Sequence, residues 1–149
     1  HEEETQPNRD RTEAKMIRYC VEHGIPIIAT CRGMQYINVL YGGKLSYHPE
    51  LPVDRPRGKD HRVHLLTENR DIYVNNFHQD VIFEDRLAPC FTPMAIDEEN
   101  HVVEAYYSEK MKLLALQWHP ERQSYALRRP DAADGAAVFE AFAAQVEQE

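Results

Sequence analysis

The sequence predicts a single domain over residues 1–149, of the α/β class, with a mostly parallel sheet at its centre. Between Gln6 and Gly43, a helical pattern, a short apolar run, a sharp turn and a second helical pattern follow one another, which is typical of α/β proteins. The apolar run Ile25–Thr30 is rich in β-branched residues, as expected for a strand buried within a parallel sheet. A length of 149 residues suits one domain with a substantial core.

The N-terminal part supports this order element by element. The first helix is expected over Gln6–Gly24, because Asp10 and Glu13 match a capping box and Gly24 supplies a stop. After the predicted strand, apolar residues return at helical spacing until Gly42 ends the second helix. A helix, a buried strand and a second helix are therefore expected in that order.

The rest of the chain alternates loops and short strands before a final helix. The proline-rich, charged segment Ser46–Asp60 is expected to form a long surface loop. The polar segment Asp97–Asn100 separates two apolar runs and predicts a hairpin turn. A stripe of apolar residues after Asp134 predicts a C-terminal helix. Five apolar runs are candidate strands: Arg62–Leu66, Ile72–Val74, Phe91–Ile96, Val102–Tyr107 and Leu113–Trp118.

Composition excludes several kinds of partner and location. With 25 acidic and 17 basic residues the formal charge is −8, which argues against a nucleic-acid-binding groove. No apolar run is long enough for a membrane span. Three widely spaced cysteines are poor material for a disulfide framework, so a reducing, cytoplasmic setting is expected. The chain does not begin with Met, and a processed N-terminus, a truncation or a missing upstream segment would each explain this.

Cys31 carries the first chemical signal, because it stands directly between the predicted strand and the second helix. A cysteine there has the placement of a nucleophile elbow, at the carboxyl ends of the strands where open α/β sheets bind ligands. The helix N-terminus favours a thiolate, and the Arg32 N–H can donate to a developing oxyanion. Gly33 is expected to permit the tight turn. The alternative is a buried, unreactive cysteine at a strand end.

A second signal stands where the last predicted strand ends in His119, Pro120 and Glu121. Pro120 directs the chain out of the strand, and His119 and Glu121, two residues apart, can be presented at one strand end. A neutral imidazole can take a thiol proton, and a carboxylate can orient that imidazole. Only the fold could bring His119 to Cys31. The alternative is a strand-capping histidine beside a solvated glutamate.

Together these residues resemble the class I glutamine amidotransferase superfamily, and most of all its gamma-glutamyl hydrolase branch, which includes gamma-glutamyl-GABA hydrolases. The resemblance follows ordered motifs over nearly the whole chain. They are Cys-Arg-Gly-Met-Gln within Pro26–Val39, Gly-Gly-Lys-Leu at Gly42–Leu45, Asn-Asn-Phe-His within Val74–His78, and Gln-Trp-His-Pro-Glu at Gln117–Glu121. The resemblance implies a flavodoxin-like three-layer sandwich whose N-terminal part is missing here, and a reaction that needs no metal and no cofactor.

By this resemblance, Cys31 is the nucleophile, His119 is the general base and then the general acid, and Glu121 is the carboxylate that orients the histidine. The main-chain N–H of Arg32 contributes to the oxyanion site. The residues expected to bind substrate are Gln35, Asn76, Phe77 and His78. The implied reaction is hydrolysis of a gamma-glutamyl amide through a cysteine thioester, which releases glutamate.

Three departures from the family pattern bear on this expectation. Ala29 stands where the family has glycine two residues before the cysteine, and we expect so small a residue to leave the elbow intact. Asn76 replaces a serine of the substrate pocket, which can alter substrate preference. The family also has an upstream segment that supplies the first strands and a second oxyanion N–H. Losing one such donor costs about 3 kcal/mol of transition-state stabilisation.

Three functions therefore stay open. The first is a free-standing gamma-glutamyl hydrolase, and the second is the glutaminase subunit of an ammonia-donating amidotransferase. The third is an inactive or redox-sensing relative in which Cys31 responds to oxidants. The expected partners are a small gamma-glutamyl substrate and either a missing N-terminal segment or a synthetase subunit. A metal site at His61 and His64 is not expected, because residues three apart on a strand face opposite sides.

Overall fold

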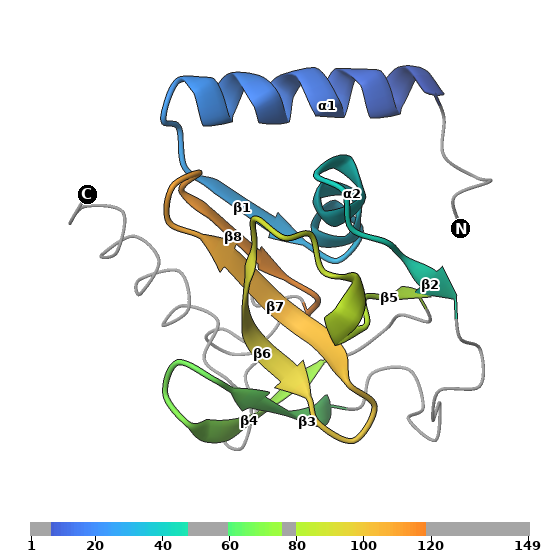
Figure 1. The fold of residues 1–149 in the computed structure, drawn as a ribbon, viewed down its shortest axis with the longest axis vertical. Coiled ribbons are helices and arrows are strands. Elements are labelled where there is room, and N and C mark those ends of the chain that lie inside the picture. The colour runs from blue at the N-terminus through green and yellow to red at the C-terminus, as the bar shows by residue number, and fades with distance from the viewer. Residues whose placement is uncertain (1–6, 48–59, 76–79, 119–149) are drawn as a thin grey trace, which may run out of the picture.

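The computed structural model describes residues 7–47, 60–75 and 80–118 of the chain (Figure 1). Two helices and eight strands are described, together with a short 3₁₀ turn at Glu84–Arg86. The helices are α1 (Pro7–Glu22) and α2 (Arg32–Leu40). The strands are β1 (Ile27–Thr30), β2 (Ser46–Tyr47), β3 (Asp60–Leu65), β4 (Arg70–Asn75), β5 (Asp80–Val81), β6 (Thr92–Asp97), β7 (Val102–Ser108) and β8 (Leu113–Leu116).

The main sheet has six strands in the order β1-β8-β7-β6-β3-β4, and β2 pairs with β5 in a separate two-stranded ribbon. The α/β class predicted from the sequence is confirmed. Among the described strands, β1 and β8 run parallel while the other pairs of the sheet run antiparallel, so this part of the sheet is mixed rather than mostly parallel. The reason is the short turns between β3 and β4, β6 and β7, and β7 and β8, since a tight connection joins only antiparallel neighbours.

The predicted helices and strands that fall within the described residues agree with the structure apart from their ends. The hairpin turn after β6 forms as expected, because the Asp97 carboxylate accepts hydrogen bonds from the Glu99 and Asn100 N–H groups at 3.1 and 3.4 Å. The loop predicted over Ser46–Asp60 is wrong at its start, where Ser46 and Tyr47 pair with β5. Residues 48–59 and the helix predicted after Asp134 lie outside the described residues.

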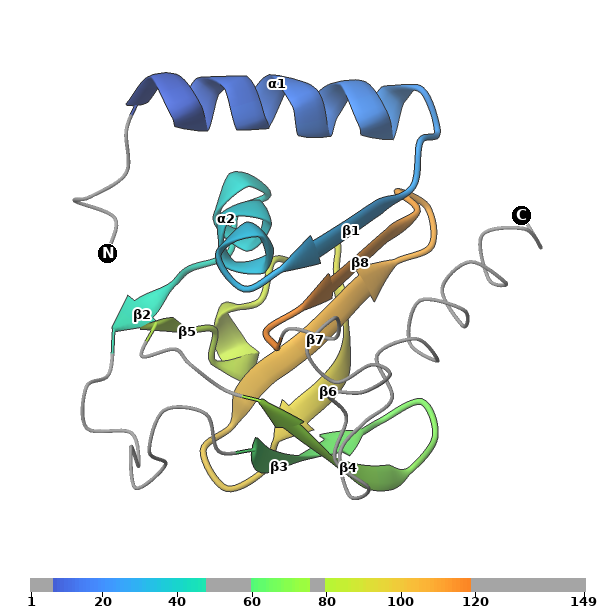
Figure 2. The ribbon, with the colours of Figure 1, turned by 180° about the vertical axis from the view of Figure 1, so that it is seen from behind.

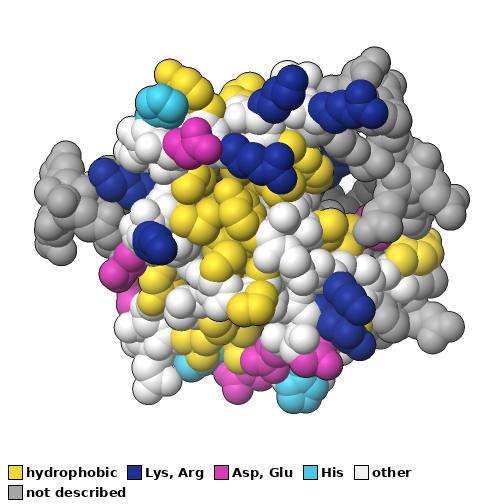
Figure 3. Space-filling view, turned by 45° about the horizontal axis from the view of Figure 1, so that its top comes forward, with side chains coloured by type: hydrophobic (Ala, Val, Ile, Leu, Met, Phe, Trp, Pro, Cys, Tyr) yellow, Lys and Arg dark blue, Asp and Glu magenta, His cyan; other side chains and the backbone are white. Residues whose placement is uncertain are grey.

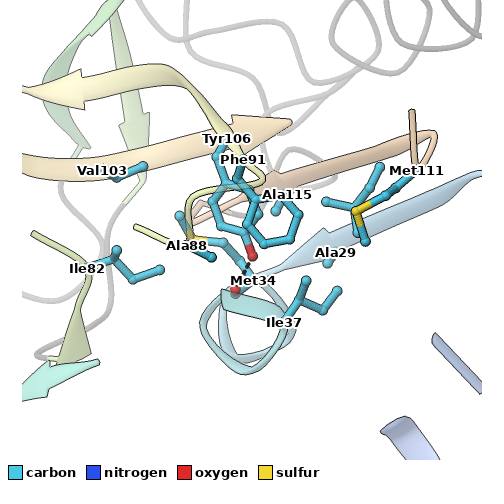
Figure 4. Packing of buried hydrophobic residues seen from close by; sticks show 11 residues of the cluster. Ala29, Met34, Ile37, Ile82, Ala88, Phe91, Val103, Tyr106, Met111 and Ala115 are labelled. Carbon is cyan, nitrogen blue, oxygen red and sulfur yellow. Dashed lines mark hydrogen bonds between the residues drawn. The ribbon is translucent and has the colours of Figure 1, made fainter. Parts of the chain in front are cut away.

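One face of the sheet carries an apolar cluster beneath α2 (Figure 4). Met34 and Ile37 of α2 pack there against Tyr106 of β7, whose ring also stacks on Phe91 with centroids 4.5 Å apart. The other buried members are Ala29, Ile82, Ala88, Val103, Met111, Leu113 and Ala115. The Tyr106 hydroxyl donates to the Met34 carbonyl at 2.5 Å. This cluster fixes α2, and with it the turn that precedes the helix, against the sheet.

The opposite face carries a second apolar cluster, toward which the sheet curls at its β3–β4 end (Figure 2). Leu114 and Leu116 of β8 lie there, while Leu113 and Ala115 face the first cluster, as the two-residue period of a strand requires. The remaining buried members are Val63, Leu65, Ile72, Val74, Ala95, Ala105 and Trp118. β8 is therefore buried on both faces, and Gln117 and Trp118, which follow it, are buried too.

Asn38, on the inner side of α2, ties the helix to two loops. Its side-chain amide donates to the carbonyls of Lys44 and Arg86 at 3.3 and 3.2 Å, and its Oδ1 accepts from the Ala88 N–H at 2.7 Å. Gly43 lies against the same amide, and a Cβ there would stand 2.1 Å from Asn38 Oδ1. The asparagine of the first motif and the second glycine of the Gly-Gly motif thus form one packing unit.

Candidate active site

Cys31 occupies the one-residue turn between β1 and α2, with φ of 48° and ψ of −112°. A non-glycine residue in this region of φ is strained by about 1–3 kcal/mol, and such strain concentrates at functional sites. The turn is held in place by β8, because the Cys31 N–H donates to the Leu116 carbonyl at 2.8 Å. A strained residue between a strand and a helix is the geometry of a nucleophile elbow. The strand itself is less buried than predicted, since among the described residues of β1 only Ala29 is fully buried.

The expectation that Gly33 makes the tight turn is wrong, because the positive φ lies at Cys31 and Gly33 is already the second residue of α2. A Cβ on Gly33 would meet the Ala29 Cβ at 3.5 Å, which is ordinary contact. The Ala29 side chain faces Gly33 with room to spare, so alanine fits here where the family has glycine, and the elbow is intact as expected.

The Cys31 thiol lies against the end of β8. Its Sγ donates a hydrogen bond to the Gln117 carbonyl at 3.0 Å. This contact follows from the parallel register, which pairs Thr30 with Leu116, so that both strands end at the same edge of the sheet. The residue after β1 and the residue after β8 are therefore neighbours, although they are far apart in the sequence.

Gln35 lies one helical turn after Cys31 and joins three elements. Its Nε2 donates to the Asp80 carbonyl of β5 at 2.9 Å and to the Gln117 Oε1 at 3.1 Å. Both glutamine side chains are buried, with Gln35 7% and Gln117 2% exposed. A buried amide needs hydrogen-bond partners, and these two contacts supply them for the Gln35 Nε2 group.

The structure therefore describes three of the predicted site residues and brings two of them together. Cys31 and Gln35 both contact Gln117, and Arg32 is the first residue of α2, where helix N–H groups point out of the N-terminus. The other predicted site residues lie outside the described residues: Asn76, Phe77, His78, His119 and Glu121.

Two residues of the site region carried no individual role in the sequence analysis. Gln117 contacts both Cys31 and Gln35, and Asn38 anchors the far end of α2. Each is an amide side chain within an otherwise apolar stretch of sequence. Such a residue is expected to be buried and therefore to need hydrogen-bond partners. Which partners they find depends on residues far along the chain.

A group of possible metal donors lies on β3, β4 and the turn after β6. His64, Asp71 and Glu98 present donor atoms within 4.8 Å of one another, but both carboxylates are exposed. The His64 Nδ1 already contacts Asp71 Oδ1 at 2.9 Å. That hydrogen bond raises the pKa of His64 above its ordinary value of 6.5, with Glu98 adding to the effect. The arrangement is that of a surface ion pair.

Among the described helices none is long and apolar enough to cross a membrane.

The strained cysteine between β1 and α2 places the protein among α/β proteins built around a nucleophile elbow. The chain belongs to the Peptidase C26 family, whose model matches residues 1–121. Two curated relatives agree with this. A candidate glutamine amidotransferase-like protein of Lactococcus lactis is 33% identical over 134 residues, which cover 78% of this chain. The gamma-glutamyl-gamma-aminobutyrate hydrolase of Escherichia coli K12 is 30% identical over 155 aligned positions, which cover 86% of this chain.

Solved structures agree on the fold. A candidate GMP synthase subunit of Thermoplasma acidophilum superimposes with a TM-score of 0.67 at 20% identity, covering 91% of this chain and 64% of that one. The chain spans 55% of the Lactococcus relative and 59% of the Escherichia relative.

Proposed function

We propose that the protein hydrolyses a gamma-glutamyl amide through a Cys31 thioester and releases glutamate. The observation that carries the proposal is the Cys31 turn, where the backbone is strained and the thiol donates to the Gln117 carbonyl at 3.0 Å. Membership of the Peptidase C26 family supports it, and so does the 30% identity to a protein named gamma-glutamyl-gamma-aminobutyrate hydrolase.

In the proposed reaction, the Cys31 sulfur attacks the amide carbonyl while His119 takes the thiol proton. His119 follows Gln117 by two residues, and two residues of chain span at most about 7 Å. The contact between Cys31 and Gln117 therefore supports a histidine within reach of the thiol. The Arg32 N–H donates to the oxyanion, and Glu121 orients the imidazole.

Collapse of the tetrahedral intermediate breaks the C–N bond, and His119 returns the proton to the leaving amine. Water then attacks the thioester with His119 again acting as base, which regenerates the Cys31 thiol and frees the gamma-carboxylate of glutamate. Gln35 and the segment Asn76–His78 bind the glutamyl group in this proposal. Support comes from the Gln35 amide, which contacts the Asp80 carbonyl two residues beyond His78.

We further propose that an additional segment, in the same polypeptide or in a partner chain, completes the site beside β1. Within the described part of the chain, β1 pairs only with β8 and so leaves one edge open. Ile25 and Ile28 expose 42% and 38% of their surface there, and Met16 and Tyr19 of α1 are more exposed still. Figure 3 shows apolar side chains gathered on the face that includes α1. A strand added at this edge would cover β1 and could carry the second oxyanion donor.

The experiment uses the full-length protein with a panel of gamma-glutamyl amines and glutamine, and it measures glutamate release. Cys31→Ala and Cys31→Ser should abolish turnover, whereas Cys90→Ser, at an exposed cysteine, should leave it unchanged. A gamma-glutamyl electrophile should label Cys31 and leave Cys90 unmodified.

The alternatives predict different results. Glutamine turnover that rises only when a synthetase partner is added would point to the amidotransferase. If no amide is cleaved and Cys31 is neither labelled nor alkylated faster than Cys90, the hydrolase proposal is wrong and a non-catalytic role is favoured.

A further inference from the structure

We infer that the Gln117 side chain is a positioning residue, which fixes the orientation of the Gln35 amide beside the Cys31 nucleophile. The expected effect on KM rests on the proposed function. The expected effect on the orientation of the Gln35 amide rests on geometry alone. Gln117 reaches the site with two different groups. Its main-chain carbonyl accepts from Cys31 Sγ at 3.0 Å, and its side-chain Oε1 accepts from Gln35 Nε2 at 3.1 Å.

The amide of Gln35 can lie in only one of its two orientations. The Asp80 main-chain carbonyl, 2.9 Å away, is an acceptor and nothing else, so the atom that faces it must be Nε2. The second hydrogen on Nε2 points to Gln117, whose facing atom must then be Oε1. With both hydrogens engaged, Gln35 presents only its Oε1 for any further contact. The polarity that this amide offers to a bound molecule is therefore set by Asp80 and Gln117.

The Gln117 side chain has no other described polar partner, because its Nε2 is buried and makes no hydrogen bond within the described part of the chain. Its side chain is thus held by its contact with Gln35 and by burial, with 2% of the residue exposed. Its main-chain N–H is fixed independently, donating to the Glu104 carbonyl at 2.8 Å. A change of side chain at position 117 should therefore alter Gln35 while leaving the main-chain contact with Cys31 in place.

The side chain and the main chain of Gln117 consequently have separable effects. If Gln35 binds the glutamyl group, loss of the Gln117 acceptor weakens substrate binding and leaves the nucleophile intact. One neutral hydrogen bond corresponds to about a fivefold change in an equilibrium constant. We expect Gln117→Met, which keeps the length of the side chain but has no strong acceptor, to raise KM about fivefold and to change kcat less than about twofold.

The kinetic test uses five variants of the full-length protein, Gln117→Met among them. Gln117→Glu retains an oxygen that can accept from Gln35 and should bring KM back to within about twofold of wild type. Gln35→Met combined with Gln117→Met should be no worse than Gln35→Met alone, because Gln117 acts through Gln35. Ser108→Ala removes a buried hydrogen bond to the Met111 N–H at the other end of β8 and should leave KM unchanged. If the increases in KM of Gln35→Met and Gln117→Met multiply in the double variant, the inference is wrong.

A structural readout decides the inference even if no amide is hydrolysed. In ¹⁵N–¹H spectra of side-chain amides, the Gln35 pair is assigned by its absence from Gln35→Met. Both of its protons should exchange slowly in the wild type, and Gln117→Met should shift one of them while the proton bonded to Asp80 stays in place. A wild-type Gln35 amide with a fast-exchanging proton, or a pair unmoved in Gln117→Met, would refute the positioning role. Absence of glutamate release with the expected spectra would refute the hydrolase proposal alone.

Discussion

Gly43→Ala tests the packing unit formed by Gly43 and Asn38. The new Cβ would lie 2.1 Å from Asn38 Oδ1 and 2.4 Å from its Cγ and Nδ2, so the amide must retreat by about 1.3 Å to reach ordinary contact. Asn38 is fully buried and makes three hydrogen bonds, to Lys44, Arg86 and Ala88. A displacement of this size breaks them. At about 1 kcal/mol for each bond, the free energy of unfolding should fall by about 3 kcal/mol.

Urea unfolding of four further variants separates this steric effect from backbone strain: Asn38→Ala, Gly42→Ala, and Asn38→Ala combined with either Gly43→Ala or Gly42→Ala. Gly43 has no positive φ, so alanine is compatible with its backbone, and in an Asn38→Ala background the Gly43→Ala change should be neutral or stabilising by a few tenths of a kcal/mol. Gly42→Ala is the matched control, because φ is 103° there and nothing lies within 4 Å. It should cost about 1 kcal/mol with or without Asn38. An equal loss from Gly43→Ala in both backgrounds would refute the reasoning.

Three other predictions follow from single contacts. Because the hydrogen bond to Asp71 raises the pKa of His64, protonated His64 stabilises the fold below pH 6.5, and that contribution is lost as the pH rises through the folded pKa. The urea midpoint should therefore fall between pH 5.5 and pH 8 by more in the wild type than in His64→Gln, and equal falls would contradict this. Tyr106→Phe removes the hydroxyl that donates to the Met34 carbonyl and should lower the free energy of unfolding by about 1 kcal/mol, whereas an unchanged urea midpoint would count against that hydrogen bond. Trp118 is the sole tryptophan and is 1% exposed, so its fluorescence should be blue-shifted and resist acrylamide quenching, and ready quenching would argue against its burial.

Much of the fold was predictable because its signals are local. The helix before Gly24, the β-branched run that became β1 and the polar turn after Asp97 all depend on residues within a few positions of one another. The mixed pairing of the sheet could not be read in the same way. Strand direction depends on which strands become neighbours, and the parallel pair β1–β8 joins segments from opposite ends of the described chain.

The candidate site was likewise predictable only where its signals are local in the sequence. The placement of Cys31 between a strand and a helix was visible locally, and so was the small residue at Ala29. The lack of a Cβ at Gly33 predicts a turn there, but the structure places the strained φ on Cys31 itself. The role of Gln117 was not predictable, since its partners Cys31 and Gln35 become neighbours only after β8 docks beside β1. The catalytic roles of Cys31, His119 and Glu121 remain predictions.

The dependence of Cys31 on β8 has a consequence for how the protein is made. The turn at Cys31 is held by the Leu116 carbonyl, and the thiol by the Gln117 carbonyl, both from the far end of the described chain. A nascent polypeptide that has left the ribosome only as far as α2 therefore carries an ordinary cysteine in an unstrained linker. The folded geometry of this cysteine arises only after residues 113–117 have been translated and have docked beside β1. Because synthesis runs from the N- to the C-terminus, the proposed nucleophile reaches this geometry only when most of the described core has already been made.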